Sequence, residues 1–82
     1  MNTIADRVRE IIADELGVGL ELVQPDADLR EQLGADSMDA LSLTLAVEDA
    51  FQIEIPDDDA TQLLTVGDVI RYVVRRTPAP AL

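Results

Sequence analysis

Three stretches of this chain carry apolar residues at helical spacing, and they constrain its fold more than any other feature. The first predicts a helix over 4–16, which Asn2 or Thr3 can cap and which Gly17 and Gly19 end. Its apolar face consists of Ile4, Val8, Ile11, Ile12 and Leu16. Aromatic residues make up only 2% of the 82-residue chain and apolar residues 48%, so the core must be aliphatic. These features favour one small all-α domain.

A second helix is predicted to begin at Ser37 or Met38 and to end at Phe51. One apolar stripe on it is expected in the core: Leu43, Val47 and Phe51, helped by Ala40 and Ala50. Another stripe, rotated around the helix, consists of Met38, Leu41 and Leu45. A central helix that is enclosed on several sides would bury both stripes. Alternatively, the second stripe is partly exposed and binds partners, with Asp36, Asp39, Glu48 and Asp49 along its edges. The pattern alone leaves both interpretations open.

The segments between these helices carry turn residues and short patterns. A long loop over 18–36 is expected, with a possible turn of helix around 29–32. Residues 52–56 alternate like a strand but stop at a proline, which indicates an extended connector. Asp57 is expected to cap a short third helix that continues to about Gln62. The alternative for the run of Asp57, Asp58 and Asp59 is weak binding of a divalent cation.

The last predicted helix begins at Thr65, where Thr65 and Asp68 have the spacing of a capping box. Its apolar face should consist of Val66, Val69, Ile70, Val73 and Val74. The sequence therefore predicts a small four-helix bundle of three main helices and one short helix, with a long loop between the first two. The domain should cover 1–76, and 77–82 should form a flexible tail.

Ser37 stands where the long loop gives way to the second helix. Serine at a helix start usually caps the helix by accepting backbone hydrogen bonds. The functional alternative is that Ser37 carries a group, and the free N–H groups and the dipole of a helix N-terminus suit a phosphate. We do not expect Ser37 to be a catalytic nucleophile, because the chain has no His or Lys to take its proton. Ser37 would instead be modified by another enzyme.

The formal net charge of −11 is unevenly distributed along the chain. Ten acidic residues and no basic residue lie in 31–68, whereas all six arginines lie outside this window. Such a surface disfavours nucleic acid and anionic membranes and attracts basic protein surfaces. The sequence has no apparent signal peptide and no apolar run long enough for a bilayer, which predicts a cytoplasmic protein. We also expect the protein to be a monomer.

The start of the second helix resembles the attachment motif of acyl carrier proteins, with the residues Leu33-Gly34-Ala35-Asp36-Ser37-Met38-Asp39. The similarity continues in order and spacing through 47–51, 53–57 and 65–69. This resemblance implies that a phosphopantetheinyl transferase moves 4'-phosphopantetheine from coenzyme A to Ser37, with Asp36 helping the transferase to recognise the site. It also implies a cleft for the acyl chain, and the candidate lining residues are Leu41, Leu45, Ile55, Leu63 and Ile70.

The function implied by the resemblance is to carry acyl thioesters in fatty-acid biosynthesis, without catalytic activity of its own. Acyl-transfer, condensing and reducing enzymes would bind through basic patches to Met38, Asp39, Leu41, Leu45, Glu48, Asp49 and Ile55. The sequence departs from bacterial fatty-acid carriers at Ser42 and Ala50, which replace common acids, at Met38, and at Thr44. These departures suggest the alternative of a dedicated carrier for a polyketide or a special lipid. Two alternatives from other classes are an acidic decoy for nucleic-acid-binding sites and a divalent-cation buffer.

Overall fold

The computed structural model describes residues 3–77, and its regular elements are all helical. In chain order they are α1 (Ile4–Leu16), the 3-10 helix η1 (Leu20–Leu22), α2 (Ser37–Phe51), α3 (Asp57–Ala60) and α4 (Val66–Arg76). The only β pairing among residues 3–77 is an isolated bridge between Asp28 and Thr65. The predicted all-α bundle, with its long loop between the first two main helices, is confirmed. Of the tail expected over 77–82, only Thr77 is described, and it is the C-cap of α4, with its N–H donating to the carbonyl of Val73 at 2.9 Å. Residues 78–82 and the alternative cap at Asn2 lie outside the described residues.

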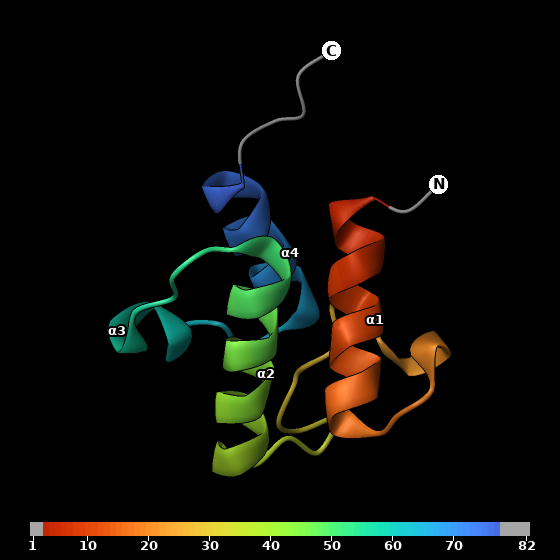
Figure 1. Cartoon of the computed structure of the whole chain (residues 1–82). Coiled ribbons are helices and arrows are strands. Elements are labelled where there is room, and N and C mark those ends of the chain that lie inside the picture. Colours follow the sequence, from red (N-terminus) through yellow and green to blue (C-terminus); the bar gives the residue numbers. More distant parts are fainter. Residues whose placement is uncertain (1–2, 78–82) are drawn as a thin grey trace.

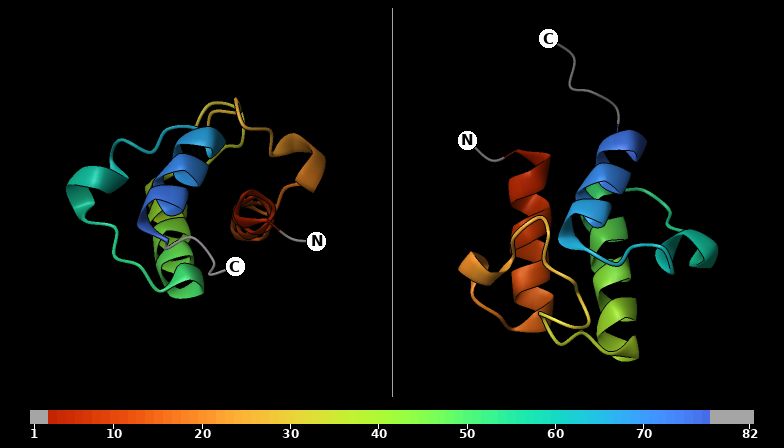
Figure 2. Two further views of the ribbon diagram at one scale, coloured as in Figure 1. Left: turned by 90° about the horizontal axis from the view of Figure 1, so that it is seen from above. Right: turned by 180° about the vertical axis from the view of Figure 1, so that it is seen from behind.

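Helix α1 packs against both α2 and α4, and it runs antiparallel to α2 (Figure 1). The short helix α3 lies on the side of α2 and α4 that faces away from α1, as the views in Figure 2 show. The core between the three long helices is aliphatic, as predicted. Its completely buried side chains are Val8, Ile12, Val23, Val47, Val66 and Val73. None of the helices in 3–77 has the length and apolar character that crossing a bilayer requires.

Each long helix begins with the same polar device, a capping box that ends in aspartate. The pairs are Thr3 with Asp6, Asp36 with Asp39, and Thr65 with Asp68. The predicted box at Thr65 is thus confirmed. Burial works to raise the pKa of Asp68, but hydrogen bonds from the N–H groups of Thr65 and Leu64 and from Arg71 outweigh it and lower this pKa. The ionised carboxylate therefore stabilises the start of α4 at neutral pH, and this stabilisation is lost as the pH falls through the lowered pKa.

Some local predictions were wrong. Asp57 does not cap α3, because Pro56 occupies the N-cap position and no side chain caps this helix, which ends at Ala60 rather than near Gln62. Val74 is 51% exposed, on the solvent side of α4, and Ala40 is also exposed. The region 29–32 forms hydrogen-bonded turns rather than a helix, whereas the short helix η1 lies earlier in the loop, where no helix was expected.

The long loop is held onto α4 by backbone hydrogen bonds. The N–H of Leu29 donates to the carbonyl of Leu64 at 2.9 Å, and the N–H of Val66 donates to the carbonyl of Ala27 at 3.1 Å. One residue further, the N–H of Gly67 donates to the carbonyl of Pro25 at 2.8 Å. This pairing brings two chain segments so close that Gly67 has no room for a side chain, since an added Cβ would lie 2.9 Å from the Pro25 oxygen.

We therefore expect Gly67→Ala to destabilise the fold, although alanine normally stabilises a helix by about 1 kcal/mol relative to glycine. Relieving the contact with the Pro25 carbonyl requires a backbone shift, which should cost about 1–3 kcal/mol. Urea unfolding followed by circular dichroism measures the difference. Gly19→Ala is the control, because the three atoms nearest to the added methyl group there all belong to the carboxylate end of the Glu21 side chain rather than to the backbone. Equal stability of the two variants would contradict the close approach at Gly67.

Candidate functional site

Ser37 is the first residue of α2, and its side chain is exposed. The capping residue is the preceding Asp36, whose Oδ1 accepts a hydrogen bond from the N–H of Asp39 at 2.8 Å. Asp39 returns the bond, because its Oδ2 accepts from the N–H of Asp36 at 3.3 Å. The interpretation of Ser37 as the cap is therefore wrong: an equally good capping residue stands one position earlier. The Ser37 hydroxyl forms no hydrogen bond to any residue of 3–77, so it remains available for substitution.

The loop that leads to Ser37 is held in place by local hydrogen bonds. Oδ1 of Asp28 accepts from the N–H groups of Arg30 and Glu31 at 2.9 and 2.8 Å. The N–H of Ala35 then donates to the carbonyl of Leu29 at 2.8 Å. Gly34 lies between these contacts with a φ of +75°, a backbone conformation that favours glycine. The sequence Gly-Ala before the Asp-Ser pair thus turns the chain sharply into α2 and orients the serine outward.

The first turn of α2 presents backbone donors beside the Ser37 hydroxyl. Asp39 and Ala40 donate their N–H groups to the side chain and the carbonyl of Asp36. The N–H groups of Ser37 and Met38 have no acceptor within the described part of the chain. Together with the positive end of the helix dipole, these donors favour an anion near Ser37. An anion at this position would therefore meet backbone donors that no residue of 3–77 uses.

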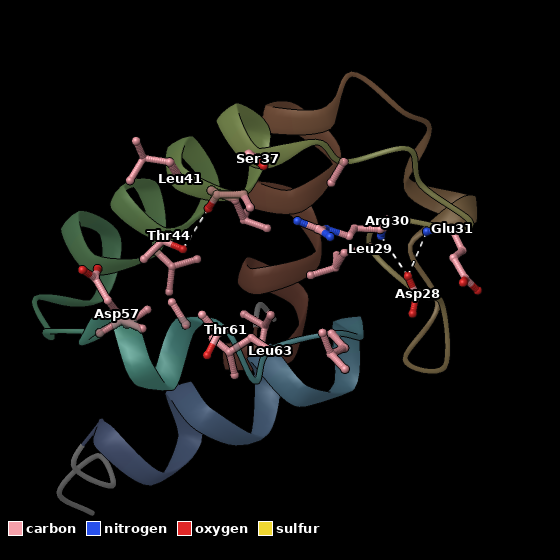
Figure 3. A pocket seen from close by; sticks show the side chains of 18 residues that line it. Asp28, Leu29, Arg30, Glu31, Ser37, Leu41, Thr44, Asp57, Thr61 and Leu63 are labelled. Carbon is pink, nitrogen blue, oxygen red and sulfur yellow. Dashed lines mark hydrogen bonds between the residues drawn. The ribbon is translucent and has the colours of Figure 1, made fainter.

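A cavity of about 680 Å³ opens beside Ser37. Figure 3 shows it between α2, the turns after Asp28, and the segment from α3 to Leu63. The volume lies in the range of small-molecule sites. Three of the predicted cleft residues, Leu41, Ile55 and Leu63, line the cavity, whereas Leu45 and Ile70 do not. Other apolar side chains complete its walls: Leu29, Ala35, Ala40, Leu43, Val47, Ala60, Leu64 and Val69.

The second apolar stripe of α2 is exposed. Met38, Leu41 and Leu45 have exposed fractions of 72%, 56% and 55%. Among the two interpretations of this stripe, the structure therefore favours the one in which it is open to partners. Ile55 differs from the other predicted partner contacts, because it is only 6% exposed and its side chain faces the cavity and the core.

Comparison with known proteins agrees with this geometry. A family model described as the phosphopantetheine attachment site matches residues 6–73. The acyl carrier protein of Sinorhizobium fredii (strain NBRC 101917 / NGR234) and the acyl carrier protein AcpP of Rhizobium meliloti (strain 1021) are each 47% identical over 73 residues. These alignments cover 89% of this chain and 94% of each relative. The chain belongs to the acyl carrier protein family. The resemblance seen in the sequence is thus confirmed, and with it a non-catalytic carrier whose prosthetic group is phosphopantetheine.

The acidic residues predicted for partner binding on this acyl carrier protein fold also have structural roles. Asp36 and Asp39 form the capping box of α2. Oε2 of Glu48 accepts a hydrogen bond from the N–H of Ile55 at 2.7 Å and so ties the connector 52–56 to α2. The Asp49 carboxylate forms no hydrogen bond or ion pair with another residue in 3–77. Asp49 is thus the residue of this set whose carboxylate makes no internal contact in the described part of the chain.

Asp59, the third residue of the aspartate run of α3, forms structural contacts with α4. Oδ2 of Asp59 accepts hydrogen bonds from the Tyr72 hydroxyl at 2.7 Å and from Nη2 of Arg76 at 3.1 Å. Burial raises the pKa of Tyr72, and its hydrogen bond to Asp59 raises it further. No group of three or more potential metal ligands occurs within residues 3–77. The cation-buffer alternative therefore has no support in this part of the molecule.

Two features of the site were missed by the sequence analysis. One is the link between α3 and α4 through Asp59, Tyr72 and Arg76. No sequence pattern predicts this link, because Asp59 is far from the other two residues in the chain. The other is Arg30, whose side chain lines the cavity together with Ser37. The isolated position of Arg30 between long acidic segments is the one sequence signal that could have drawn attention to it.

Two substitutions at Asp36 can distinguish the effect of its capping hydrogen bond from the effect of its charge. Asparagine caps a helix as well as aspartate does, so Asp36→Asn should leave the free energy of unfolding nearly unchanged. Asp36→Ala should lower it by about 1 kcal/mol. Urea unfolding of both variants in the unmodified state measures these values. An asparagine variant as unstable as the alanine variant would show that the charge of Asp36, and not its capping bond, stabilises α2.

Proposed function

We propose that this chain carries acyl intermediates as thioesters on a 4'-phosphopantetheine arm attached to Ser37, and that it serves fatty-acid biosynthesis. The observation that carries the proposal is the exposed and unbonded Ser37 hydroxyl at the mouth of an apolar cavity. Family membership supplies the prosthetic group. We further propose that the chain works as a monomer in the cytoplasm, with a phosphopantetheinyl transferase and the enzymes of a synthase as its partners.

In the attachment reaction this chain supplies the hydroxyl group that is modified. Oγ of Ser37 forms a bond to the phosphorus of the pantetheine phosphate in coenzyme A. The pyrophosphate P–O bond breaks, and adenosine 3',5'-bisphosphate leaves. The chain has no His, Lys or Cys, and we propose that a base of the transferase accepts the hydroxyl proton. The bound arm supplies the thiol that forms the thioester. The role of Ser37 is to present its hydroxyl outward from α2, beside Asp36, which we propose as a recognition element for the transferase.

Partner enzymes would bind the exposed stripe of Met38, Leu41 and Leu45, with the acids along its edges. This surface combines an apolar centre with carboxylates, which suits basic patches that surround an apolar contact. Ile55 would contribute by lining the cavity rather than by touching a partner enzyme, because its side chain is buried. Asp39 and Glu48 would act both on partners and on the fold, since each also forms an internal hydrogen bond.

The attachment site is tested by intact mass after incubation with coenzyme A and a broad-specificity phosphopantetheinyl transferase. We expect the parent chain to gain one phosphopantetheine and Ser37→Ala to gain none. The matched control is Ser42→Ala, because Ser42 is the only other serine and is exposed on the same helix. This control should be modified like the parent.

Modification of Ser37→Ala would exclude Ser37 as the attachment residue. Failure of the parent with several transferases, while its circular dichroism shows a folded chain, would remove the basis of the carrier function itself.

The docking surface is tested through its charge. Turnover of the malonyl-loaded carrier by a fatty-acid condensing enzyme should fall as sodium chloride rises from low to physiological concentration, because exposed ion pairs are screened. Asp49→Asn should lower turnover at low salt by less than about tenfold and flatten its salt dependence. Asp14→Asn, an exposed charge removal on α1, is the control and should behave like the parent. A parent whose turnover is insensitive to salt would contradict electrostatic docking.

The alternative of a dedicated carrier for a polyketide or a special lipid is favoured by Ser42. This residue is exposed on the docking helix at a position where bacterial fatty-acid carriers commonly have glutamate. If partners of this chain recognise a surface with less charge, then Ser42→Glu should raise its turnover with a standard set of fatty-acid enzymes. Unchanged turnover would remove the support for the alternative.

A further inference from the structure

Arg30 is the cationic side chain of the cavity. Four of the other arginines have partners elsewhere on the molecule. Arg7 lies over the Phe51 ring, Arg9 donates to the carbonyls of Val23 and Leu20, Arg71 pairs with Asp68, and Arg76 pairs with Asp59. The Arg30 guanidinium forms no hydrogen bond or ion pair with any residue between 3 and 77. It is therefore a free cation in the wall of a site that also contains Ser37.

The backbone of Arg30 is held firmly, although its side chain is exposed. Its N–H donates to Oδ1 of Asp28 at 2.9 Å, and its carbonyl accepts from the N–H of Gly34 at 3.1 Å. In Figure 3 the side chain extends from this turn into the opening between α2 and the Leu63 segment. The loop thus places a long cationic side chain at the mouth of an otherwise mainly apolar cavity.

The acids in the cavity wall do not neutralise this cation. The Asp28 carboxylate accepts bonds from two backbone N–H groups. The Glu31 side chain leaves the turn in a different direction from the Arg30 side chain, and Asp57 lies at the far end of the cavity on α3 (Figure 3). No ion pair within 4.0 Å joins Arg30 to any of the three. At the same time, these acids repel any anion that enters, so an anionic group in the cavity needs a cation beside it.

We propose that Arg30 binds an oxyanion that the modified protein carries into the mouth of the cavity. Two groups have this chemistry: the phosphodiester at Ser37 and a carboxylate on the acyl cargo. The proposal rests on the proposed modification of Ser37. A guanidinium can donate two parallel hydrogen bonds to either group, whereas an alkyl chain has no atom that accepts a hydrogen bond. Because the site is open to solvent, the preference for an anionic cargo over an alkyl cargo should be less than about tenfold.

The test compares four forms of the full chain: unmodified, phosphopantetheinylated, octanoyl-loaded, and suberyl-loaded. Suberyl cargo has the same length as octanoyl cargo but ends in a carboxylate. Intact mass first verifies each form, so that a failure to modify Ser37 counts against the proposed function and is recognised as such. The readouts are the NMR resonance of the Arg30 Nε–H group and the melting temperature. The variants are Arg30→Gln, Arg30→Lys and, as a control, Arg75→Gln, an exposed arginine outside the cavity wall.

If the carboxylate is the bound oxyanion, the Arg30 resonance moves only in the suberyl form. The suberyl form should then melt roughly 2–5 °C above the octanoyl form. Arg30→Gln should abolish this difference, Arg30→Lys should keep most of it, and Arg75→Gln should leave it unchanged. Added salt should reduce it.

If the phosphodiester is the bound oxyanion, the Arg30 resonance moves as soon as the arm is attached and changes little with cargo. Arg30→Gln should then lower the melting temperature of the phosphopantetheinylated form more than that of the unmodified form. Either result supports the proposal and identifies the group. A resonance that is the same in all four forms, with equal effects of Arg30→Gln and Arg75→Gln, would overturn it.

Discussion

The pairing between the long loop and the start of α4 is the interaction on which the position of the functional serine depends. A loop of this length costs conformational entropy on folding, and a surface loop without anchors would leave the start of α2 loosely placed. Three backbone hydrogen bonds from 25–29 to 64–67 hold it, and Val23, Ala27, Leu29 and Leu33 bury apolar groups beneath it. The same turn that is held against α4 contains Asp28 and Arg30. The same pairing therefore stabilises the fold and positions the site. Gly67 makes this pairing possible, because it leaves space for the Pro25 carbonyl.

The cavity exists because α2 and α4 both pack on α1, while a thin wall closes the space between them on the other side. This wall consists of the connector 52–56 and of α3, and α3 itself has no buried residue. Both polar contacts and packing hold it: Glu48 binds the N–H of Ile55, Asp59 binds Tyr72 and Arg76, and Ile55 is buried in the core. The α3 side of the cavity thus depends on fewer buried side chains than the α2 side, where Leu43 and Val47 are both buried.

Much of this architecture could be predicted from local patterns. Helical spacing gave α1, α2 and α4, and the Thr-x-x-Asp spacing gave the cap of α4. Errors arose where two neighbouring residues were equally suitable. Asp36 and Ser37 can both cap a helix, and Pro56 takes the N-cap position that was expected for Asp57. The pairing of the loop with α4, the buried position of Ile55 and the location of Arg30 depend on contacts between distant segments, about which periodicity and propensity carry no information.

The charge of the surface and the stability of the fold are coupled through the same carboxylates. A net charge of −11 on 82 residues destabilises a compact state by self-repulsion. Here part of that cost is offset because Asp6, Asp39 and Asp68 lie in the first turns of the long helices, where the dipole favours them. A phosphodiester on Ser37 would add one more negative charge between Asp36 and Asp39. The unpaired N–H groups of the first turn of α2 and the guanidinium of Arg30, which lines the same cavity as Ser37, are positive groups of this site. Arg30 thus gives this acidic surface a local site at which an added anion is stabilised rather than repelled.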